Sequence, residues 1–475
     1  MKLDQVFERR CPLPVSAEEA YAWHARPGAF ARLMPPWAPV ECLVPPTSLD
    51  EGSEAVLRVS LGPIKKRWVA RHSKPEPGVF FEDVQVSGPF ARWVHRHSFE
   101  PADEGCVLVD HIDYRLPLGP LGALFGSIHA RKDLERTFAH RHRIVAWDIA
   151  RHAASGRENV MKIAVTGSTG LVGTQLLPFL TTGGHQVLRL VRGAASGADE
   201  VSWSPELGLE PDALAGVDAV VHLAGAGIAD KRWNPKRKQL IRDSRVVGTR
   251  KLCEALAAME RKPEVLVCAS AVGFYGERDE PVDESSPAGS GFLADTCAAW
   301  ERATRPAREA GIRVVNLRFG VILSPKGGAL KKMLLPFKMG GGGRLGSGEQ
   351  PMAWIGLDDA VGAVHHALLT EELSGPVNVV APEPATNASY TKTLGKVLRR
   401  PTVFPMPALV ARMAFGEMAQ ELLLTGATVV PTELERTGYR FLTPDLESTL
   451  RHLLGKTKGG VASGVSHATG VPAST

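Results

Sequence analysis

A run of glycines after a short apolar strand is the feature of this sequence most suited to chemistry. The stretch Lys162–Thr166 leads directly into seven residues with the spacing Gly-x-x-Gly-x-x-Gly, namely Gly167, Ser168, Thr169, Gly170, Leu171, Val172 and Gly173. A predicted helix follows through Leu180. Glycines permit a tight turn and a close approach of the backbone to a diphosphate, and a helix N-terminus offers free N–H groups and partial positive charge. The spacing therefore predicts a dinucleotide-binding loop.

The residue after the next predicted strand indicates which dinucleotide this loop would take. Strand Gln186–Val191 is followed by Arg192, whereas an acidic residue at this place would bind the ribose hydroxyls of NAD. A guanidinium can pair bidentately with a phosphate, so Arg192 favours NADP(H), with NAD(H) as the alternative cofactor. The competing interpretation is an ordinary solvated arginine. After the third strand, Leu223, Ala224 and Gly225 would let the cofactor pass close to the backbone.

Hydroxyl groups follow a later strand. The apolar stretch Val265–Ser270 ends in a serine, and Tyr275 comes five residues later. Doubly wound enzymes place chemistry where strands end, so Ser270 and Tyr275 are the candidate catalytic residues. The stretch Gly340–Gly348 is too glycine-rich for a core. It predicts either a lid or anion-binding loop beside a substrate cleft, with Arg344 as the anion partner, or a disordered connection.

The elements that must position these residues lie between residues 161 and 454, where short apolar runs alternate with helical stretches. That alternation is typical of a parallel, doubly wound α/β sheet of the Rossmann type. The predicted strands are Lys162–Thr166, Gln186–Val191, Ala219–Leu223, Val265–Ser270, Val314–Arg318 and Val377–Val380.

The residues before this region follow a different pattern. A helix at Leu121–Ala154 comes after strands separated by turn signals, which predicts an α+β helix-grip arrangement of an antiparallel sheet around a long helix. The predicted strands are Val6–Cys11, Ala55–Ser60, Arg67–His72, Val79–Val86, Ala91–Phe99 and Val107–Tyr114. His95 and His97 share one face of their strand. The favoured interpretation is that they are exposed strand positions, and the alternative is a polar feature inside a cavity.

A small, polar stretch at residues 153–160 separates the two patterns, and nine of the fifteen histidines lie before it. We therefore predict a ligand-binding domain over residues 1–155 and an NAD(P)-binding Rossmann domain over 161–370. A small C-terminal substrate lobe is expected over 371–454. The last residues, 455–475, are small and polar without periodicity, and they predict a disordered tail.

Composition bounds the class of protein. A chain of 475 residues predicts two or three domains, and its net charge of +5 spread over this length gives no basic footprint for nucleic acid. No apolar run approaches the roughly 20 residues needed to span a membrane. The six cysteines show neither close pairing nor metal-type spacing, so we predict reduced thiols, no metal site and a cytoplasmic location.

Taken together, the segments from Gly167 to Gly276 resemble the short-chain dehydrogenase superfamily, in its extended NAD-dependent epimerase/dehydratase branch. Further segments are similar to one atypical subgroup, which is nucleoside-diphosphate-sugar-epimerase-like. They are Ile228 with Arg232-Trp233, Ser244-Arg245 with Gly248-Thr249, Ser270–Gly276, Phe292–Glu301, Gly327–Leu330, Leu345–Gly348, and Trp354-Ile355 with Asp358-Asp359. Residues Gly375–Leu450 resemble the C-terminal domain of that subgroup. The resemblance implies NADP(H)-dependent redox or epimerase chemistry on a small-molecule substrate.

Part of the chemistry implied by this resemblance is missing. The superfamily uses Tyr-x-x-x-Lys on a helix, in which the lysine lowers the tyrosine pKa and the tyrosine moves the proton. This chain has Cys297-Ala-Ala-Trp-Glu301 instead, an arginine at position 245 where related enzymes carry asparagine, and a serine one residue further from Tyr275. In one interpretation Ser270 and Tyr275 support a modified reaction with Tyr275 as proton donor. In the other, the protein binds cofactor without turnover, Cys297 is a core thiol and Glu301 a surface charge.

The N-terminal region carries a second resemblance. It is similar to the START-related polyketide cyclase/dehydrase superfamily at Phe7, Tyr21–Arg26, Pro35-Pro36-Trp37 and Gly88–Phe90, with Trp93, His95 and His97. This resemblance implies an apolar ligand held between a curved sheet and a long helix. The leading hypothesis is an NADP(H)-binding epimerase or oxidoreductase fused to a hydrophobic-ligand-binding module. The alternatives are a non-catalytic dinucleotide-binding redox sensor, and a lipid or small-molecule carrier with a vestigial dehydrogenase domain.

Overall fold

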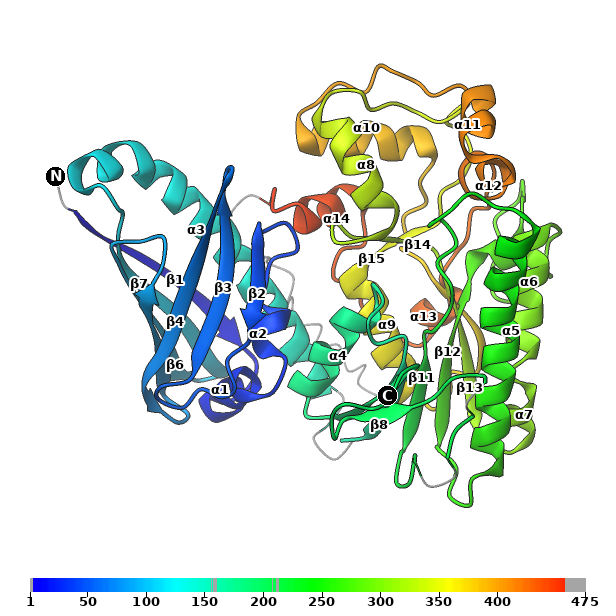
Figure 1. Cartoon of the computed structure of the whole chain (residues 1–475), viewed down its shortest axis with the longest axis horizontal. Coiled ribbons are helices and arrows are strands. Elements are labelled where there is room, and N and C mark those ends of the chain that lie inside the picture. Colours follow the sequence, from blue (N-terminus) through cyan, green and yellow to red (C-terminus); the bar gives the residue numbers. More distant parts are fainter. Residues whose placement is uncertain (1–2, 155, 157–159, 207, 211–212, 458–475) are drawn as a thin grey trace, which may run out of the picture. The chain divides into compact units, whose positions relative to one another are not determined.

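The computed structural model describes residues 3–154, 156, 160–206, 208–210 and 213–457. The chain forms two compact units (Figure 1). The N-terminal unit is Met1–Ala154 together with Gly455–Thr475, and the C-terminal unit is Ser155–Leu454. The predicted disordered tail lies, from residue 458 onward, outside the described residues.

The N-terminal unit is an antiparallel sheet with strand order β1-β7-β6-β5-β4-β3-β2. Its strands are β1 (Asp4–Leu13), β2 (Val40–Val44), β3 (Glu54–Leu61), β4 (Ile64–Glu76), β5 (Phe80–Ser87), β6 (Arg92–Ala102) and β7 (Gly105–Arg115). Its helices are α1 (Ala17–Ala25), α2 (Ala29–Arg32) and the long α3 (Gly119–Ala154). The predicted α+β arrangement is confirmed.

The sequence pattern of this unit predicted six of its strands but missed β2. Four of the five residues of β2 are exposed, because it is an edge strand that pairs only with β3, so the strand lacks the alternation that burial imposes on its neighbours. Alternate residues of the central strands face α1 and α3 and form two apolar clusters. One lies around Phe81, Phe99 and Leu108, and the other around Trp93.

The C-terminal unit is built on an all-parallel sheet with strand order β10-β9-β8-β11-β12-β13-β16. The strands are β8 (Lys162–Thr166), β9 (Gln186–Val191), β10 (Glu200–Ser202), β11 (Ala219–His222), β12 (Val265–Ala271), β13 (Arg313–Phe319) and β16 (Gly375–Val379). This is the doubly wound order in which the chain reverses direction across the sheet between β8 and β11. The predicted Rossmann-like fold is confirmed, and the carboxyl ends of β8 and β11 are where a dinucleotide is expected.

Helices cover both faces of this sheet, as Figure 1 shows, with α5, α6 and α7 together on one face and α4 and α9 on the other. Their bounds are α4 (Gly173–Thr182), α5 (Pro235–Ala258), α6 (Phe292–Arg302), α7 (Arg305–Glu309) and α9 (Leu357–Leu369). A single 3-10 turn, Val272–Tyr275, follows β12 directly.

A smaller lobe packs around its own apolar core. Its elements are β14 (Val321–Leu323), β15 (Trp354–Gly356), α8 (Gly328–Lys338), α10 (Asn387–Leu398), α11 (Ala408–Phe415), α12 (Glu417–Ala419), a π-helical turn at Gln420–Leu424 and α14 (Leu446–Leu453). The short α13 (Thr432–Arg436) packs against β16 of the main sheet. Its core gathers Leu330 and Phe337 of α8, Trp354 of β15, Tyr390 of α10 and Leu450 of α14. The lobe therefore draws on segments before residue 371 as well as after it, while β16 completes the main sheet.

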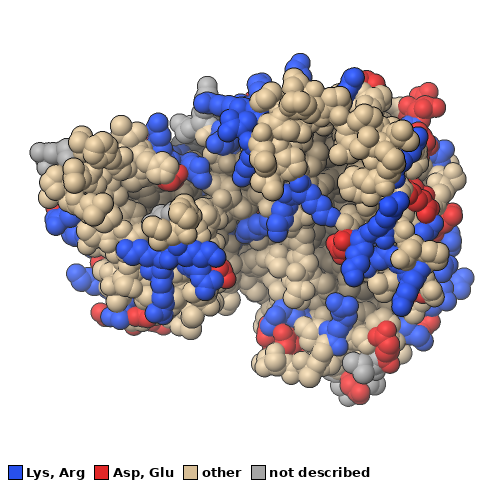
Figure 2. Space-filling view, turned by 45° about the horizontal axis from the view of Figure 1, so that its top comes forward, with Lys and Arg blue, Asp and Glu red and all other residues tan. Residues whose placement is uncertain are grey.

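None of the described helices is both long enough and apolar enough to cross a bilayer. Figure 2 shows basic side chains distributed over the visible face of the molecule and interrupted by uncharged and acidic surface.

Candidate cofactor and active site

The glycine loop links β8 to α4 at the point where the strand order reverses. Gly167 has a φ of +69°, a conformation that side chains rarely adopt. A Cβ added there would lie 2.8 Å from the carbonyl carbon of Leu223 and 3.0 Å from the nitrogen of Ala224. The loop therefore passes directly against the end of β11, and only glycine allows this approach.

The other two glycines of the motif bring the start of α4 close to the loop. A Cβ on Gly173 would press on Gly167 and lie 2.8 Å from the Cα of Ser168, while the Gly170 nitrogen donates to the Gly167 carbonyl at 2.9 Å. The helix has Val172 at its N-cap and no capping side chain. The nitrogens of Thr174 and Gln175 already donate to the carbonyls of Gly170 and Val172, so an anion at this helix start would meet the N–H groups that precede Thr174.

A buried polar network fixes the end of β11 beside the loop. The Thr166 hydroxyl accepts hydrogen bonds from the nitrogens of Leu223 and Ala224, at 3.1 and 3.2 Å, and lies 2.7 Å from Nδ1 of His222. Because this hydroxyl already accepts twice, it donates its proton to His222. The other ring nitrogen of His222 then donates to the Thr249 hydroxyl at 3.0 Å. Burial lowers the pKa of His222 to about 4, which keeps the ring neutral.

The segment Leu223–Gly225 is supported from α5 by two residues that sequence reasoning had treated only as family markers. The Ser244 hydroxyl accepts from the Ala226 nitrogen at 3.1 Å, and Arg245 Nη1 donates to the Ala226 carbonyl at 3.0 Å. Arg245 is 8% exposed and lies over the ring of Trp300. Arg245 thus holds the segment that follows β11 in place.

Arg192 follows β9 directly and has an exposed side chain. Among the described residues it forms no hydrogen bond or ion pair, although its charge helps to lower the pKa of Glu206, whose hydrogen bonds with Ser204 act more strongly. A guanidinium at the end of the second parallel strand is thus available to an anionic ligand.

The carboxyl ends of the next three strands carry a row of polar side chains in register. Ser270 of β12 stands beside Arg318 of β13, which stands beside Asn378 of β16. The Ser270 hydroxyl donates to Glu301 Oε1 at 2.7 Å, and the Arg318 guanidinium grips both oxygens of Glu301 at 2.8 Å. Glu301 is therefore no ordinary surface charge. Its charge is neutralised by Arg318, an arginine from the sheet.

Tyr275 ends the 3-10 turn after β12 and is fully buried. Its hydroxyl donates to Asn378 Oδ1 at 2.7 Å and accepts from Arg318 Nη1 at 2.8 Å. Burial raises the pKa of Tyr275 above its ordinary value, although the nearby Arg318 charge opposes the shift. The structure thus joins both predicted catalytic residues, Ser270 and Tyr275, to one network through Arg318.

Arg318 and Asn378 were missed as site residues by sequence reasoning. The signal was a charged or amide residue inside an otherwise apolar parallel strand, where burial on both faces disfavours polar groups. Cys297 does not join this polar network. It is 4% exposed, and burial raises its thiol pKa to about 12, as expected for a core thiol.

The glycine-rich stretch is an anchored loop and not a disordered connection. The Leu345 nitrogen donates to Asn387 Oδ1 at 2.8 Å, and Met406 bonds through its backbone to Arg344 and Gly346. The Arg344 side chain is exposed.

In the N-terminal unit, the favoured interpretation of His95 and His97 as exposed is wrong. They are 2% and 7% exposed, because their shared strand face is covered by α1 and α3, with the ring of His97 beside His24 and that of His95 beside Phe138.

Comparisons with known proteins identify each region. Residues 163–380 match the NAD dependent epimerase/dehydratase family, and residues 406–453 match a domain of unknown function, DUF1731. Residues 13–140 match the polyketide cyclase / dehydrase and lipid transport family. All three predicted resemblances are confirmed.

Individual relatives share these regions to different extents. An epimerase family protein of Mycobacterium tuberculosis is 48% identical over 281 residues, which cover 59% of this chain and 93% of that protein. A structure described as the nucleoside-diphosphate sugar epimerase from Corynebacterium glutamicum is 33% identical with a TM-score of 0.78, and the match covers 95% of this chain and 90% of that one.

Human epimerase family protein SDR39U1, solved with NADPH, is 35% identical with a TM-score of 0.58, over 62% of this chain and 99% of that one. The chain therefore belongs to the NAD-dependent epimerase/dehydratase family and carries a polyketide cyclase-like domain on its N-terminal side.

Proposed function

We propose that the C-terminal unit binds NADP(H) and transfers hydride between its nicotinamide and a small-molecule substrate. The observation that carries this proposal is the loop at Gly167–Gly173, whose first and last glycines leave no room for a Cβ and whose helix N-terminus is uncapped. The human relative solved with NADPH supports the choice of cofactor.

Arg192 is the residue we propose for the 2′-phosphate, since its exposed guanidinium follows the second strand of the sheet. The segment Leu223–Gly225 would lie along the cofactor at the edge of β11. Ser168, Thr169, Leu171 and Val172 complete the loop, with Thr169 and Gly170 on its exposed side.

Ser270 and Tyr275 are the proton-handling residues that we propose. The raised pKa of Tyr275 keeps its phenol protonated at neutral pH, which suits a proton donor in carbonyl reduction and does not suit a base. The hydroxyl would have to exchange its bond with Asn378 for one with substrate. The Ser270–Glu301 pair would orient a substrate hydroxyl or carbonyl.

The direct test measures NADPH oxidation by the full chain over a panel of carbonyl compounds and sugar nucleotides, with Tyr275→Phe and Ser270→Ala beside the wild type. We expect turnover that Tyr275→Phe lowers about 100-fold, as loss of a general acid does, without a change in NADPH affinity. Turnover that is insensitive to both substitutions would remove these residues from the mechanism.

The competing function is cofactor binding without turnover, as in a redox sensor. The observation in its favour is that Tyr275 is fully buried and its hydroxyl already has a donor and an acceptor. Tight NADPH binding with no oxidation across the whole panel would select this function.

We also propose an apolar ligand for the N-terminal unit. Its family match includes lipid transport, and Leu121, Leu124, Phe125 and Ile128 near the start of α3 are 60–79% exposed. Native mass spectrometry of the full chain, purified without organic solvent, tests this. A chain that carries no apolar adduct counts against the proposal.

The six free cysteines, five of them buried, fit a reducing compartment, and we propose the cytoplasm.

A further inference from the structure

Four polar side chains form a belt across the inner face of the antiparallel sheet. They are Asp83 on β5, His95 and His97 on β6, and Asp110 on β7, and strand register pairs Asp83 with His95 and His97 with Asp110. The belt lies between the two apolar clusters of the unit. Burying ionisable groups inside a core is costly unless they are paired or bind a metal. Part of this pairing is present, since Asp110 contacts His95 and His142, and Asp83 contacts His72.

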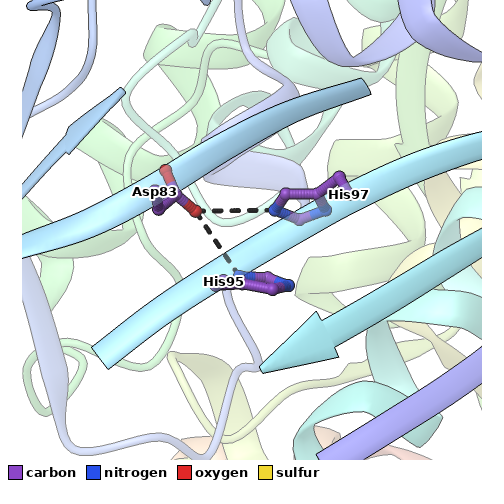
Figure 3. A group of neighbouring side chains, drawn as sticks. All are labelled: Asp83, His95 and His97. Atoms are coloured by element: carbon purple, nitrogen blue, oxygen red, sulfur yellow. Dashed lines mark ion pairs between the residues drawn. The ribbon is translucent and has the colours of Figure 1, made fainter. Parts of the chain in front are cut away.

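Three atoms of the belt converge on one point. Asp83 Oδ2 lies 3.4 Å from His95 Nδ1 and 3.5 Å from His97 Nε2. One potential ligand atom from each of the three residues lies within 4.8 Å of the other two. Figure 3 shows both imidazole rings beside the Asp83 carboxylate, with the two histidines on one strand and the aspartate on its neighbour. At these distances the contacts are too long for strong hydrogen bonds.

Asp110 holds the opposite edges of the same rings. Its Oδ1 lies 2.8 Å from His95 Nε2, which donates to it, and 2.8 Å from His97 Nδ1, which lies off the hydrogen-bonding direction. A carboxylate this close favours a proton on each of these nitrogens. In neutral rings, His95 Nδ1 and His97 Nε2 then turn lone pairs toward Asp83, where only a cation would make the arrangement favourable.

The charges of the belt lead to the same requirement. The belt holds two carboxylates, and the guanidinium of Arg141 on α3 is close enough for the charges of both aspartates to act on it. The site attracts a positive charge, and a proton and a metal ion are the two species able to supply it.

We propose that Asp83, His95 and His97 bind a divalent transition-metal ion of the zinc type. Ligands about 2.0–2.1 Å from a tetrahedral ion are separated from each other by roughly 3.4 Å, which is the spacing of the Asp83 oxygen from both ring nitrogens. Imidazole and carboxylate donors suit zinc and its neighbours. Asp110 is the outer carboxylate that orients metal-binding histidines, a recurrent companion of such sites.

Two further features fit this site. His72 Nε2 lies 3.1 Å from the other Asp83 oxygen, which fixes the carboxylate, and the Asp83 side chain is 21% exposed, so the site is not sealed on all sides. Three protein ligands leave a fourth position for water or an oxygen atom of a bound molecule. The N-terminal unit would then hold an oxygen-bearing ligand at its metal, and not a purely apolar one.

The test is titration of the full, chelator-treated chain with Co²⁺, read by visible absorption, followed by displacement with Zn²⁺ and elemental analysis. We expect one equivalent bound with the intense absorption of a tetrahedral site. His97→Gln and Asp83→Asn should each weaken binding at least about 100-fold, and Asp110→Asn about 10-fold or more because it removes an orienting group and no ligand. The matched control is His111→Gln, whose ring is 39% exposed and pairs with Glu8.

Circular dichroism and thermal melting of the metal-free variants distinguish the loss of a ligand from the loss of folding. The Co²⁺ absorption spectrum of the wild-type chain tests the proposal without any variant. Added Zn²⁺ should raise the melting temperature of the wild type and of His111→Gln but not that of His97→Gln. A wild-type chain that binds no Co²⁺ in the tetrahedral form, or one whose binding survives both ligand substitutions, overturns the proposal and assigns a proton to His97 instead.

Discussion

The glycine loop of the C-terminal unit and the polar belt of the N-terminal unit are built on opposite principles. The loop presents backbone N–H groups at the ends of parallel strands and owes its shape to the absence of side chains at Gly167 and Gly173. The belt is made entirely of side chains, on three adjacent antiparallel strands, and is buried between two apolar clusters.

This difference decides how each site fails. A backbone site tolerates changes of charge around it but not an added carbon, because the loop passes within contact distance of the end of β11. A buried site made of side chains tolerates a change in the size of a neighbouring residue better than the loss of a charge. When one charge is removed, its former partner remains unpaired in a medium of low dielectric. Four substitutions test this contrast.

Gly167→Ala should have the largest effect. The left-handed backbone costs about 1–2 kcal/mol with a Cβ, and forcing that carbon against Leu223 costs about 1–3 kcal/mol more. We expect NADPH affinity, measured by calorimetry, to fall about 1,000-fold. Gly248→Ala is the matched control, since the new carbon would make only an ordinary 3.6 Å contact inside α5. Equal loss in both variants would show that the loop is not special.

Asp110→Asn keeps the shape of the belt and removes its charge. The side chain contacts His95, His97 and His142, so we expect the N-terminal unit to lose about 3 kcal/mol of unfolding free energy with a chelator present. Hydrogen exchange of the β6 and β7 amides measures this. Asp113→Asn on the same strand, with a 41% exposed side chain, should change stability by less than about 0.5 kcal/mol.

Acid should loosen the C-terminal unit through His222. Its folded pKa of about 4 lies below the ordinary value near 6.5, so its contribution is complete above pH 6.5 and declines as pH falls toward 4. At pH 5 the loss is about 2 kcal/mol. Hydrogen exchange of β8 and β11 in the wild type and in His222→Gln, at pH 7 and pH 5, measures it. An identical pH dependence in the variant would contradict this assignment.

Arg192→Ala should have the smallest effect, because the residue is exposed and contributes one charge-assisted contact. We expect NADPH binding to weaken about 10-fold, or about 1.4 kcal/mol, with NADH binding unchanged. Arg261→Ala is the control, since that exposed side chain pairs with Asp218, which precedes β11 and lies at the amino ends of the strands. Equal weakening for both nucleotides would place Arg192 away from the 2′-phosphate.

The fold and the dinucleotide loop were predictable from the sequence because their signals are local. The strands at Lys162–Thr166 and Gln186–Val191 have the predicted bounds, and the glycine motif lies between a strand and a helix as expected. Local steric demands produce residue patterns at fixed spacing along the chain. The edge strand β2, the short β10 and the β14–β15 pair lack such a pattern and were missed.

Only the tertiary structure decided the rest. Ser270, Arg318 and Asn378 become neighbours through the register of three parallel strands, and Glu301 reaches them from α6. Asp83, His95 and Asp110 likewise meet only when β5, β6 and β7 pair and their inner face closes against α3. The sequence by itself determined the order of the strands and helices and the glycine loop, because those depend on neighbouring residues. Contacts between residues distant in the chain, and the burial of His95 and His97, arise from strand pairing and packing, which place polar groups together where water no longer separates them.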